Sequence, residues 1–548
     1  MRFLRASSMF WITTTILLIA LVFTAIYVYL VYHLGPSHWS ISNRFINIWF
    51  SSMLAFFAVQ GVMIQAKAGI TGQSKPSIIL NNAYFILMAV IFLEIAASWD
   101  VYGRGDVGLW SMSIIVMCIL NVYCLSTSGP SPPPSKKKNR VIHPISEQSR
   151  LISDSSDDLD ILYDGRRSNS DGWGCCGWVL FYFNCGLKLL VLVFACLLMK
   201  GAIAHGMGIQ HHAPKEGEFL DLPLGPATYP DTQSIYYRCE GNSTEYPTLI
   251  LEHDISHGMV EWLGIFPLLV QDGFRVCIWD KPGTGFSEYA FRHQFRPKYY
   301  YSKFIQALAE EEPDFQGPYV FIGGSTGGGQ IVLQLAQANP SLVSSVILLD
   351  ALTPNFSLKS LVTLKNVTET QRDLIWHQAI DTNRKLLGIF NSVAVPFGLM
   401  SSFVPQKPTN NKYWSLDDRM EQRWQSITEK TWIIKYWEPS FSAKNLNSSL
   451  PIDPRIPVHV IMSALSDAQI ERHVCRDNRD FEDNLSESDC HFKKAQNKLA
   501  IMEKRSLAQN GGRIVECTQD YCGLDYFIYE DPAYTLNLIR QLILNEPI

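Results

Sequence analysis

One glycine-rich stretch constrains the fold of this chain more than any other, and it runs Phe321-Ile322-Gly323-Gly324-Ser325-Thr326-Gly327-Gly328-Gly329. The apolar run 319–322 before it predicts a short buried strand, and the run 330–336 after it predicts a helix. A strand that reverses sharply into a helix needs glycines, because side chains would clash at the turn and the central residue is strained. Such a turn would present the Ser325 hydroxyl at the carboxyl edge of a sheet, facing the N–H of Thr326 and the helix N-terminus. The simpler alternative is a turn whose serine merely caps the helix.

Five apolar runs precede this stretch. The first, 9–34, follows Arg2 and Arg5, is too long for a signal-peptide core and is followed by no small-residue cleavage site, so it predicts a signal anchor. Each run approaches the ~20 residues needed to cross a bilayer. We therefore expect a four-span transmembrane bundle at residues 1–125 and a fifth transmembrane helix at 174–204. The four later runs are 46–66, 78–99, 107–125 and 178–199.

Two charged residues lie inside these apolar runs. Glu94 stands near a predicted helix end, from which its side chain can reach the membrane interface. Lys188 is more central, so we expect it to have a buried partner, and Glu94 is one candidate.

The distribution of Lys and Arg predicts the orientation. If Arg2 and Arg5 are placed in the cytosol, the other basic residues near the apolar runs fall on the same side, namely Lys67, Lys75 and the cluster 136–140. Five membrane crossings then leave the chain after residue 205 on the opposite side of the membrane. N-glycosylation sequons occur only beyond that point. Both patterns predict a multi-pass membrane protein with a cytosolic N-terminus and a lumenal or extracellular C-terminal domain. The sequons are at Asn242, Asn355, Asn366, Asn447 and Asn484.

Composition limits the remaining segments and the partners. Residues 126–173 combine Ser-Pro-Pro-Pro, the basic cluster and an acidic serine run, which predicts a disordered cytosolic linker. A net charge of −5 over 548 residues does not favour a nucleic-acid partner. Cys and His show no spacing typical of metal sites, so we expect no metal and no cofactor. The expected partner is the lipid bilayer.

The C-terminal cysteines carry expectations of their own. An oxidising compartment permits disulfides, and Cys475–Cys490 and Cys517–Cys522 are plausible local pairs. Cys277 lies in an apolar run and is predicted to be a buried thiol.

Strand and helix patterns alternate from about residue 230. A helical pattern at 259–271 separates two of the predicted strands. Repeated β-α units imply a parallel sheet with helices on both faces. The predicted strands are 233–237, 248–253, 274–280, 319–322, 345–350, 456–463 and 513–517.

Three motifs occur in order in this region. They are His253-Asp254 after a strand, the D-x-P-G-x-G-x-S segment Asp280–Ser287, and the Gly323–Gly327 turn. With these motifs, residues 225–548 resemble the α/β-hydrolase superfamily. The resemblance implies an α/β-hydrolase domain at 205–548, with a mostly parallel sheet and a helical cap at about 351–456. Tryptophans in the cap would form its core or an apolar wall suited to an acyl chain.

The resemblance also implies roles for individual residues. Ser325 matches the nucleophile, and the oxyanion hole would be formed by the N–H of Thr326 with that of Asp254 or Ile255. The family usually has a glycine where Asp254 stands. Asp467 matches the acid of the catalytic triad.

The triad histidine is missing. The position that the family fills with histidine after its last strand is Asp525 here, or Leu524 if the alignment shifts by one. The last histidine in the chain is His491, which precedes the final strand. Asp350 is the alternative acid, although a structural role is favoured for it.

Two function classes follow. The first is a membrane-anchored serine hydrolase acting on an ester or lipid-like acyl substrate, with an atypical base. His253 and His257 on the oxyanion loop are candidate surrogate bases, whereas His473 and His491 belong to a charged surface insertion. The second class is a catalytically impaired hydrolase-fold domain that binds a ligand or scaffolds a partner.

Overall fold

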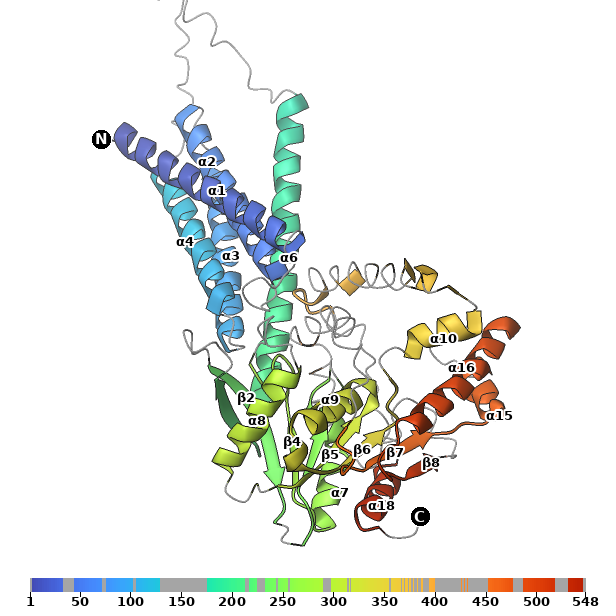
Figure 1. Ribbon diagram of the computed structural model, residues 1–548. Helices are drawn as coiled ribbons and strands as arrows, with labels where there is room; N and C mark the ends of the chain where they lie inside the picture. The colour runs from blue at the N-terminus through green and yellow to red at the C-terminus, as the bar shows by residue number, and fades with distance from the viewer. Residues whose placement is uncertain are drawn as a thin grey trace, which may run out of the picture. The chain divides into compact units, whose positions relative to one another are not determined.

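The computed structural model describes two compact units, one of apolar helices and one with an α/β fold (Figure 1). Residues 394–399 and isolated residues between 367 and 431 are also described. The other described residues are 2–32, 44–70, 75–101, 105–128, 175–211, 216–223, 232–242, 245–254, 257–288, 297–312, 315, 317–353, 356–365, 452–476, 486–517 and 531–545.

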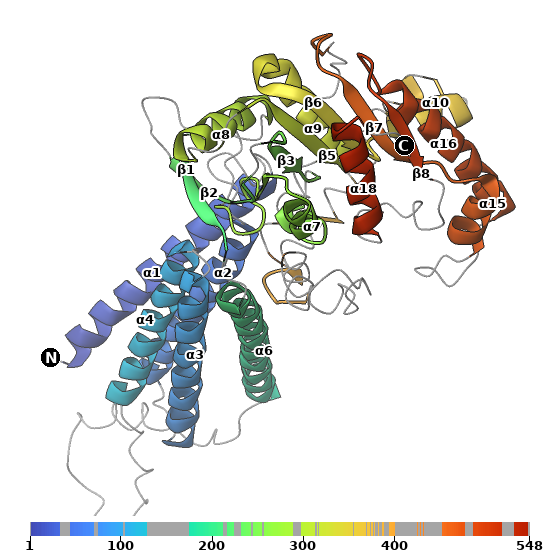
Figure 2. The ribbon, with the colours of Figure 1, turned by 90° about the horizontal axis from the view of Figure 1, so that it is seen from below.

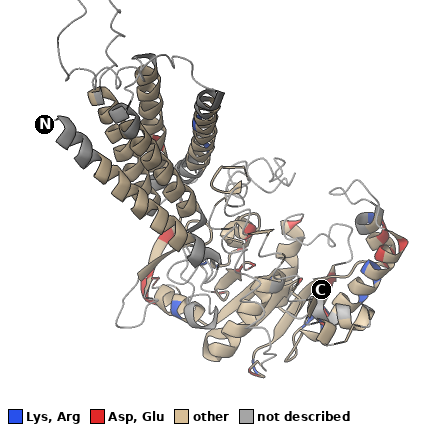
Figure 3. Cartoon of the chain, turned by 90° about the horizontal axis from the view of Figure 1, so that it is seen from above, with Lys and Arg blue, Asp and Glu red and all other residues tan. Residues whose placement is uncertain are grey.

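Five described helices are long and apolar enough to cross a membrane, and each coincides with one predicted span. Few charged side chains interrupt them, as the tan ribbons of Figure 3 show. Their apolar windows are 18 to 23 residues long, which matches the length that a bilayer requires. The helices are α1 (Arg2–Tyr32), α2 (Arg44–Ile70), α3 (Lys75–Val101), α4 (Gly105–Ser128) and α6 (Cys175–His211).

Lys188 on α6 lies against α3. Its Nζ donates a hydrogen bond to Asn81 Oδ1 and lies 5.5 Å from the centroid of the Tyr84 ring. An amide oxygen and an aromatic face both stabilise a partly desolvated ammonium group. Glu94, the partner considered from the sequence, is exposed on α3.

The α/β unit is built on one eight-stranded sheet with the order β1-β2-β4-β3-β5-β6-β7-β8. Strands β1 and β2 pair antiparallel with each other, and β2 pairs antiparallel with β4. From β4 to β8 the pairing is parallel, as the β-α alternation predicts. The strands are β1 (Glu218–Pro223), β2 (Thr232–Glu240), β3 (Leu249–Glu252), β4 (Val276–Trp279), β5 (Tyr319–Gly324), β6 (Val343–Leu349), β7 (Val458–Ser463) and β8 (Ile514–Cys517).

Helices cover both faces of this sheet (Figure 2). On one face, α8 (Pro297–Glu311) and α9 (Ser325–Ala338) contribute buried side chains to one apolar core. On the other face, α7 (Phe266–Gln271) and α18 (Pro532–Ile543) contribute to a second core. Beyond β7 lie α15 (Asp467–Ile470), the helical turn Glu471–Arg476 and α16 (Glu487–Ser506). Placing helices on both faces leaves the carboxyl ends of the parallel strands as the edge where a site can form.

The helix predicted at 259–271 is broken in two. A 3₁₀ helix, Met259–Trp262, comes first, and α7 begins at Phe266 with a proline in its first turn. Proline lacks the N–H that would continue the preceding helix, but it fits the first turn of a new one.

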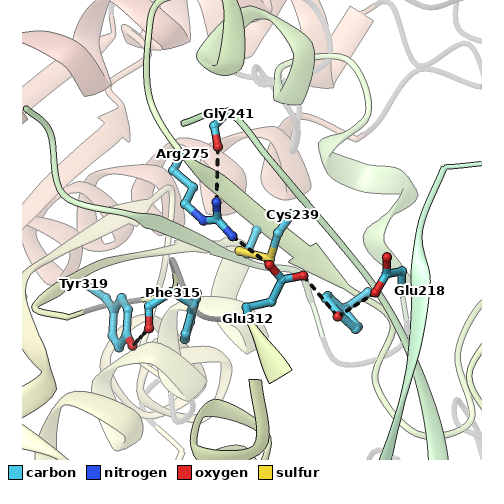
Figure 4. Close-up of a disulfide and its surroundings, with 9 residues drawn as sticks. Glu218, Cys239, Gly241, Arg275, Glu312, Phe315 and Tyr319 are labelled. Carbon is cyan, nitrogen blue, oxygen red and sulfur yellow. Dashed lines mark hydrogen bonds and ion pairs between the residues drawn. A yellow bond between two sulfur atoms is a disulfide. The ribbon is translucent and has the colours of Figure 1, made fainter. Parts of the chain in front are cut away.

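The prediction that Cys277 is a buried free thiol is wrong, because Cys277 forms a disulfide with Cys239 (Figure 4). The two residues are directly paired between antiparallel β2 and β4, a register that the apolar pattern around Cys277 cannot reveal. Beside the disulfide, Arg275 Nη2 lies 2.8 Å from Glu312 Oε2. This ion pair ties the start of β4 to the end of α8.

The other disulfide predictions have separate outcomes. The Cys475–Cys490 pair is confirmed and joins the helical turn Glu471–Arg476 to α16. Cys517 is disulfide-bonded, but Cys522 lies outside the described residues, so that pairing stays a prediction. In the predicted cap, α10 (Phe356–Lys365) is the longest described element. The tryptophans predicted to line the cap lie outside the described residues, at 376, 414, 424, 432 and 437.

Candidate active site

The glycine-rich turn joins β5 directly to α9, and Ser325 is the first residue of the helix. Its φ is +58°, a left-handed backbone conformation that non-glycine residues rarely adopt. Gly324 has no capping side chain at this helix, so Ser325 stands at the strained position of the turn and is not the N-cap. The strain that the sequence predicts for this serine is therefore present.

The turn is pressed against the end of the neighbouring strand β3. A Cβ added to Gly328 would lie 2.5 Å from the carbonyl oxygen of Glu252 and 3.0 Å from that of His253. Within the turn, a Cβ on Gly323 would lie 2.6 Å from the carbonyl oxygen of Gly328. Glycine is required at both positions because backbone occupies the space that a side chain would need.

The Ser325 hydroxyl donates a hydrogen bond to Asp254, with 3.1 Å between Oγ and Oδ2. Asp254 follows the end of β3, which is the place that the sequence predicts for the oxyanion loop. No histidine is among the hydrogen-bond partners of Ser325 within the described residues. A carboxylate therefore faces the candidate nucleophile where the resemblance implies a glycine.

The backbone N–H of Asp254, a predicted oxyanion donor, has a partner of its own. It donates to Glu261 Oε2 at 3.1 Å, and the other oxygen of the Glu261 carboxylate pairs with His257 Nδ1. Ile255, the alternative donor, lies outside the described residues. Thr326 occupies the second position of α9, where backbone N–H groups lack intrahelical partners.

Within the described part of the chain, no hydrogen bond joins His253 to the Ser325 hydroxyl. Its side chain is fully buried, with Nδ1 2.9 Å from the carbonyl oxygen of Asp254 and Nε2 3.1 Å from that of Trp279. Burial, reinforced by the charge of Lys281, holds the pKa of His253 well below its ordinary value. The imidazole is therefore neutral at neutral pH, and it supports the loop through the backbone. His257, the other candidate surrogate base, pairs with Glu261.

A buried ion pair lies directly beneath this loop. Lys281 Nζ contacts Glu252 Oε1 at 2.9 Å and donates to the carbonyl oxygens of His253 at 2.5 Å and Asp254 at 2.8 Å. Glu252 is 1% exposed, and Trp279 Nε1 donates to its other oxygen at 2.9 Å. Burial raises the pKa of Glu252, while Lys281 opposes that rise. Lys281 thus fixes the orientation of two consecutive peptide groups in the loop that carries Asp254.

The Asp280–Ser287 motif is structural. The buried Asp280 carboxylate accepts hydrogen bonds from the backbone N–H of Met259 at 2.8 Å and of Phe286 at 3.0 Å. Gly285 has a φ of +43°, and a Cβ there would lie 2.1 Å from Asp280 Oδ2. The motif therefore closes a turn around its own aspartate and so positions Lys281 beneath the loop.

The two candidate acids both pair with lysines of α16. Asp467 is exposed at the start of α15, and its Oδ2 lies 2.7 Å from Lys498 Nζ. Asp350, at the end of β6, accepts a hydrogen bond from Lys504 Nζ at 2.5 Å and from the Ser463 hydroxyl at 2.7 Å. Lys504 is 6% exposed. These contacts link β6, β7 and α16, which agrees with the structural role favoured for Asp350.

Asp525 and Leu524 lie outside the described residues, as do the sequon asparagines Asn355, Asn366, Asn447 and Asn484. Asn242 is described and is exposed just after β2. Lys281 and Glu252 were missed by sequence reasoning, because a lysine in a glycine-rich loop usually indicates an exposed side chain. The sequence did offer one signal: Glu252 directly precedes the His253-Asp254 motif, and Lys281 lies within the Asp280–Ser287 motif.

Residues 247–454 match the model of a protein family described as alpha/beta hydrolase fold. Non-heme chloroperoxidase of Streptomyces lividans is 29% identical over 132 residues, which are 24% of this chain and 46% of that protein. The chain thus spans about half the length of this curated relative. The strand order and the family match together show that the C-terminal part has the α/β-hydrolase fold.

Similar solved structures include two epoxide hydrolases. The Cif epoxide hydrolase from Acinetobacter nosocomialis is 13% identical, covering 63% of this chain and 96% of its own, with a TM-score of 0.42. A putative epoxide hydrolase from Pseudomonas aeruginosa is 12% identical, covering 61% of this chain and 97% of its own, with a TM-score of 0.39.

Proposed function

We propose that this chain, whose C-terminal part has the α/β-hydrolase fold, is a membrane-anchored serine hydrolase acting on an ester or lipid-like acyl substrate. The family match supports a hydrolase-type function. The observation that carries the proposal is the conformation of Ser325. Its φ is +58° at the junction of β5 and α9, and its hydroxyl donates a hydrogen bond to the Asp254 carboxylate. A serine in this position is presented for attack, with backbone N–H groups of the helix start beside it.

The substrate class follows from the setting of the domain. The five apolar helices support anchoring in a lipid bilayer, and a domain tethered to a bilayer meets amphiphilic esters at high local concentration. The net charge of −5 argues against a nucleic-acid partner. We infer that the substrate is a hydrophobic ester or acyl compound.

The state of the cysteines supports a lumenal or extracellular position for the α/β domain. Its described cysteines Cys239, Cys277, Cys475, Cys490 and Cys517 are all in disulfides. Cys118, Cys185 and Cys196 of the apolar helices, by contrast, are in no disulfide within the described residues. Disulfides persist in oxidising compartments, and this agrees with the sequons and with the Lys/Arg distribution, from which a cytosolic N-terminus is predicted.

Protease protection tests this topology. In sealed vesicles, an epitope tag inserted near residue 150 should be cleaved from the cytosolic side, and a C-terminal tag should be protected. Peptide N-glycosidase should lower the apparent mass, and Asn242→Gln should remove one glycan from the set. Protection of the residue-150 tag together with cleavage of the C-terminal tag would reverse the proposed orientation.

A fluorophosphonate probe tests the hydrolase activity, because only an activated serine reacts with it quickly. The full chain in membranes should be labelled, and peptide mass spectrometry should find the adduct on Ser325. Ser325→Ala should abolish labelling without loss of the folded domain. Labelling that persists in Ser325→Ala would show that another residue is the nucleophile.

Three observations favour the alternative of a catalytically impaired binding or scaffolding module. The N–H of Asp254 is engaged by Glu261, both candidate acids pair with lysines of α16, and the family's histidine position is Asp525. A wild-type domain that neither reacts with the probe nor hydrolyses short-chain nitrophenyl esters would favour this alternative.

A further inference from the structure

The Ser325 hydroxyl is engaged by a carboxylate, although hydrolases of this fold usually employ an imidazole. The contact of 3.1 Å between Ser325 Oγ and Asp254 Oδ2 is within the range that proton transfer from a nucleophile requires. We propose that Asp254 is the general base that activates Ser325. The proposal rests on the proposed hydrolase function and deepens it by naming the base.

The backbone of Asp254 is held from both sides. Its carbonyl oxygen accepts a hydrogen bond from Lys281 Nζ at 2.8 Å, and its N–H donates to Glu261 Oε2 at 3.1 Å. Lys281 and Glu261 are 5% and 8% exposed, so both anchors are themselves fixed by packing. A catalytic group held by such partners approaches its target without reorganisation.

The approach of the two chain segments is equally rigid. Gly328 of α9 contacts the backbone at the end of β3 so closely that no Cβ fits between them. The turn that carries Ser325 and the loop that carries Asp254 are therefore in direct backbone contact. Their separation cannot change without shifting β3 or α9.

The charges around Asp254 come from three elements. The loop after β4 contributes an ammonium group, the 3₁₀ helix a carboxylate, and the end of β3 and its loop a carboxylate and two imidazoles. Burial keeps the pKa of His253 low and that imidazole neutral. These groups are Lys281, Glu261, Glu252, His253 and His257.

The reaction balances with Asp254 as the only proton carrier. Ser325 Oγ attacks the ester carbonyl carbon while its proton passes to Asp254 Oδ2, and the resulting carboxylic acid returns that proton to the departing alcohol. A water molecule then transfers a proton to Asp254 as its oxygen attacks the acyl carbon. Ser325 recovers the proton as the carboxylic acid product leaves, so ester and water yield acid and alcohol.

This arrangement also explains how a carboxylate can stand beside a developing oxyanion. Two negative charges at close range would raise the energy of the transition state. Asp254, however, becomes neutral as it takes the proton, so the negative charge moves from its carboxylate to the oxyanion. The start of α9 supplies N–H groups to the oxyanion at that moment.

Two substitutions separate activation from obstruction. Asp254→Asn keeps the size of the side chain and cannot accept the proton, and Asp254→Gly introduces the residue usual for the resembling family. Asp254→Asn is made together with Ser256→Ala and compared with Ser256→Ala alone, because asparagine at position 254 would otherwise complete a glycosylation sequon with Ser256. We expect both substitutions of Asp254 to lower the probe-labelling rate and the hydrolysis of a nitrophenyl ester by roughly 10²–10⁴-fold, the usual contribution of a general base. Asp221→Asn, which alters an exposed aspartate on β1, is the matched control and should keep the wild-type rate.

The pH profile gives an independent readout. With a carboxylate base, the wild-type rate should follow the ionisation of a carboxyl group, without the inflection near about pH 6.5 that an imidazole base produces. Circular dichroism of each variant in the full chain shows whether it is folded. If Asp254→Gly does not fold, Asp254→Asn alone decides.

Three results would overturn the proposal, and they have different meanings. If Asp254→Asn is labelled as fast as wild type, another group is the base and the hydrolase proposal stands. If Asp254→Gly or Asp254→Asn reacts faster than wild type, Asp254 obstructs the site. If neither the wild type nor the variants react, the hydrolase proposal falls together with the assignment of the base.

Discussion

Cys239 and Cys277 stand directly opposite each other on antiparallel strands β2 and β4, and a disulfide joins them. The bond attaches the antiparallel edge of the sheet to its parallel body. It also closes a loop between residues separated by 38 positions, and this loop contains β3 and α7. The cross-link therefore restricts the unfolded chain across the segment that supplies the candidate oxyanion loop.

Replacing both Cys239 and Cys277 with serine should lower the free energy of unfolding of the α/β domain by about 3–4 kcal/mol, because the loop is then open in the unfolded state. Thermal unfolding followed by near-UV circular dichroism measures the loss. Cys196→Ser, which alters an exposed free cysteine of α6, is the control. Equal melting temperatures for the double variant and the wild type would contradict the prediction.

The buried pair Lys281–Glu252 predicts a non-additive pair of substitutions. Lys281→Met should destabilise the domain by about 3–5 kcal/mol, because it leaves the Glu252 carboxylate buried without its counter-ion. Glu252→Gln on that background should recover part of the loss, since it removes the charge and keeps an acceptor for Trp279. A double-mutant cycle on thermal unfolding measures the coupling, and additive effects would show that the charges are not coupled.

A side chain at position 328 should disrupt the junction between α9 and β3. Gly328→Ala places a Cβ 2.5 Å from the carbonyl oxygen of Glu252, so β3 or α9 must shift. We expect a large loss of folded domain, measured as the yield of protease-resistant protein in membranes. Ser325→Ala, which removes one hydroxyl in the same turn, should give the wild-type yield, and a similar loss in both variants would argue against the close approach at Gly328.

The domain should lose stability on acidification, in part through His459. Its Nδ1 accepts a hydrogen bond from the backbone N–H of Arg513 at 3.1 Å, and burial followed by the charge of Arg513 lowers its pKa from 6.5. Below pH 6.5 the unfolded imidazole takes a proton that the folded one does not, so stability falls as the pH falls from that value toward the folded pKa. His253, with a pKa lowered in the same way, acts in the same direction.

His459→Asn isolates this contribution, because an amide oxygen replaces the Nδ1 acceptor and does not titrate. Between about pH 7.5 and about pH 5.5 the variant should lose less free energy of unfolding than the wild type, with a difference of up to about 1.4 kcal/mol per pH unit. Thermal unfolding at each pH measures this as a smaller fall in melting temperature. Glu252, whose raised pKa acts in the opposite direction, is present in both proteins. Parallel pH profiles would show that His459 does not contribute.

The glycine-rich turn at Ser325 and most of the sheet could be predicted because their signals are local. The glycines around Ser325 indicate a sharp turn without any information about the rest of the fold. Short apolar runs likewise indicate every parallel strand from β3 to β8. Strand β1 is not predicted, because Glu218–Pro223 shows no regular alternation of apolar and polar residues and ends in proline. Such a short edge strand is specified by its pairing with β2 more than by its own pattern.

The contacts of the site could not be predicted because they are set by register and by packing. Asp254 was recognised as a departure from the family's glycine, but its distance to Ser325 depends on how closely β3 and α9 approach. Cys277 finds Cys239 only through the pairing of β2 with β4. Asp467 follows the predicted strand β7, yet its side chain turns to Lys498, because α16 packs beside α15.

The Lys281–Glu252 pair has a consequence for how this sequence can change over generations. Replacing either residue alone leaves an uncompensated buried charge, at a loss of stability that consumes much of the margin of about 5–15 kcal/mol that a typical domain has. Lineages that abandon the pair must therefore pass through a poorly folding intermediate or exchange both residues nearly together. Among descendants of a common ancestor, positions 252 and 281 should vary as a unit.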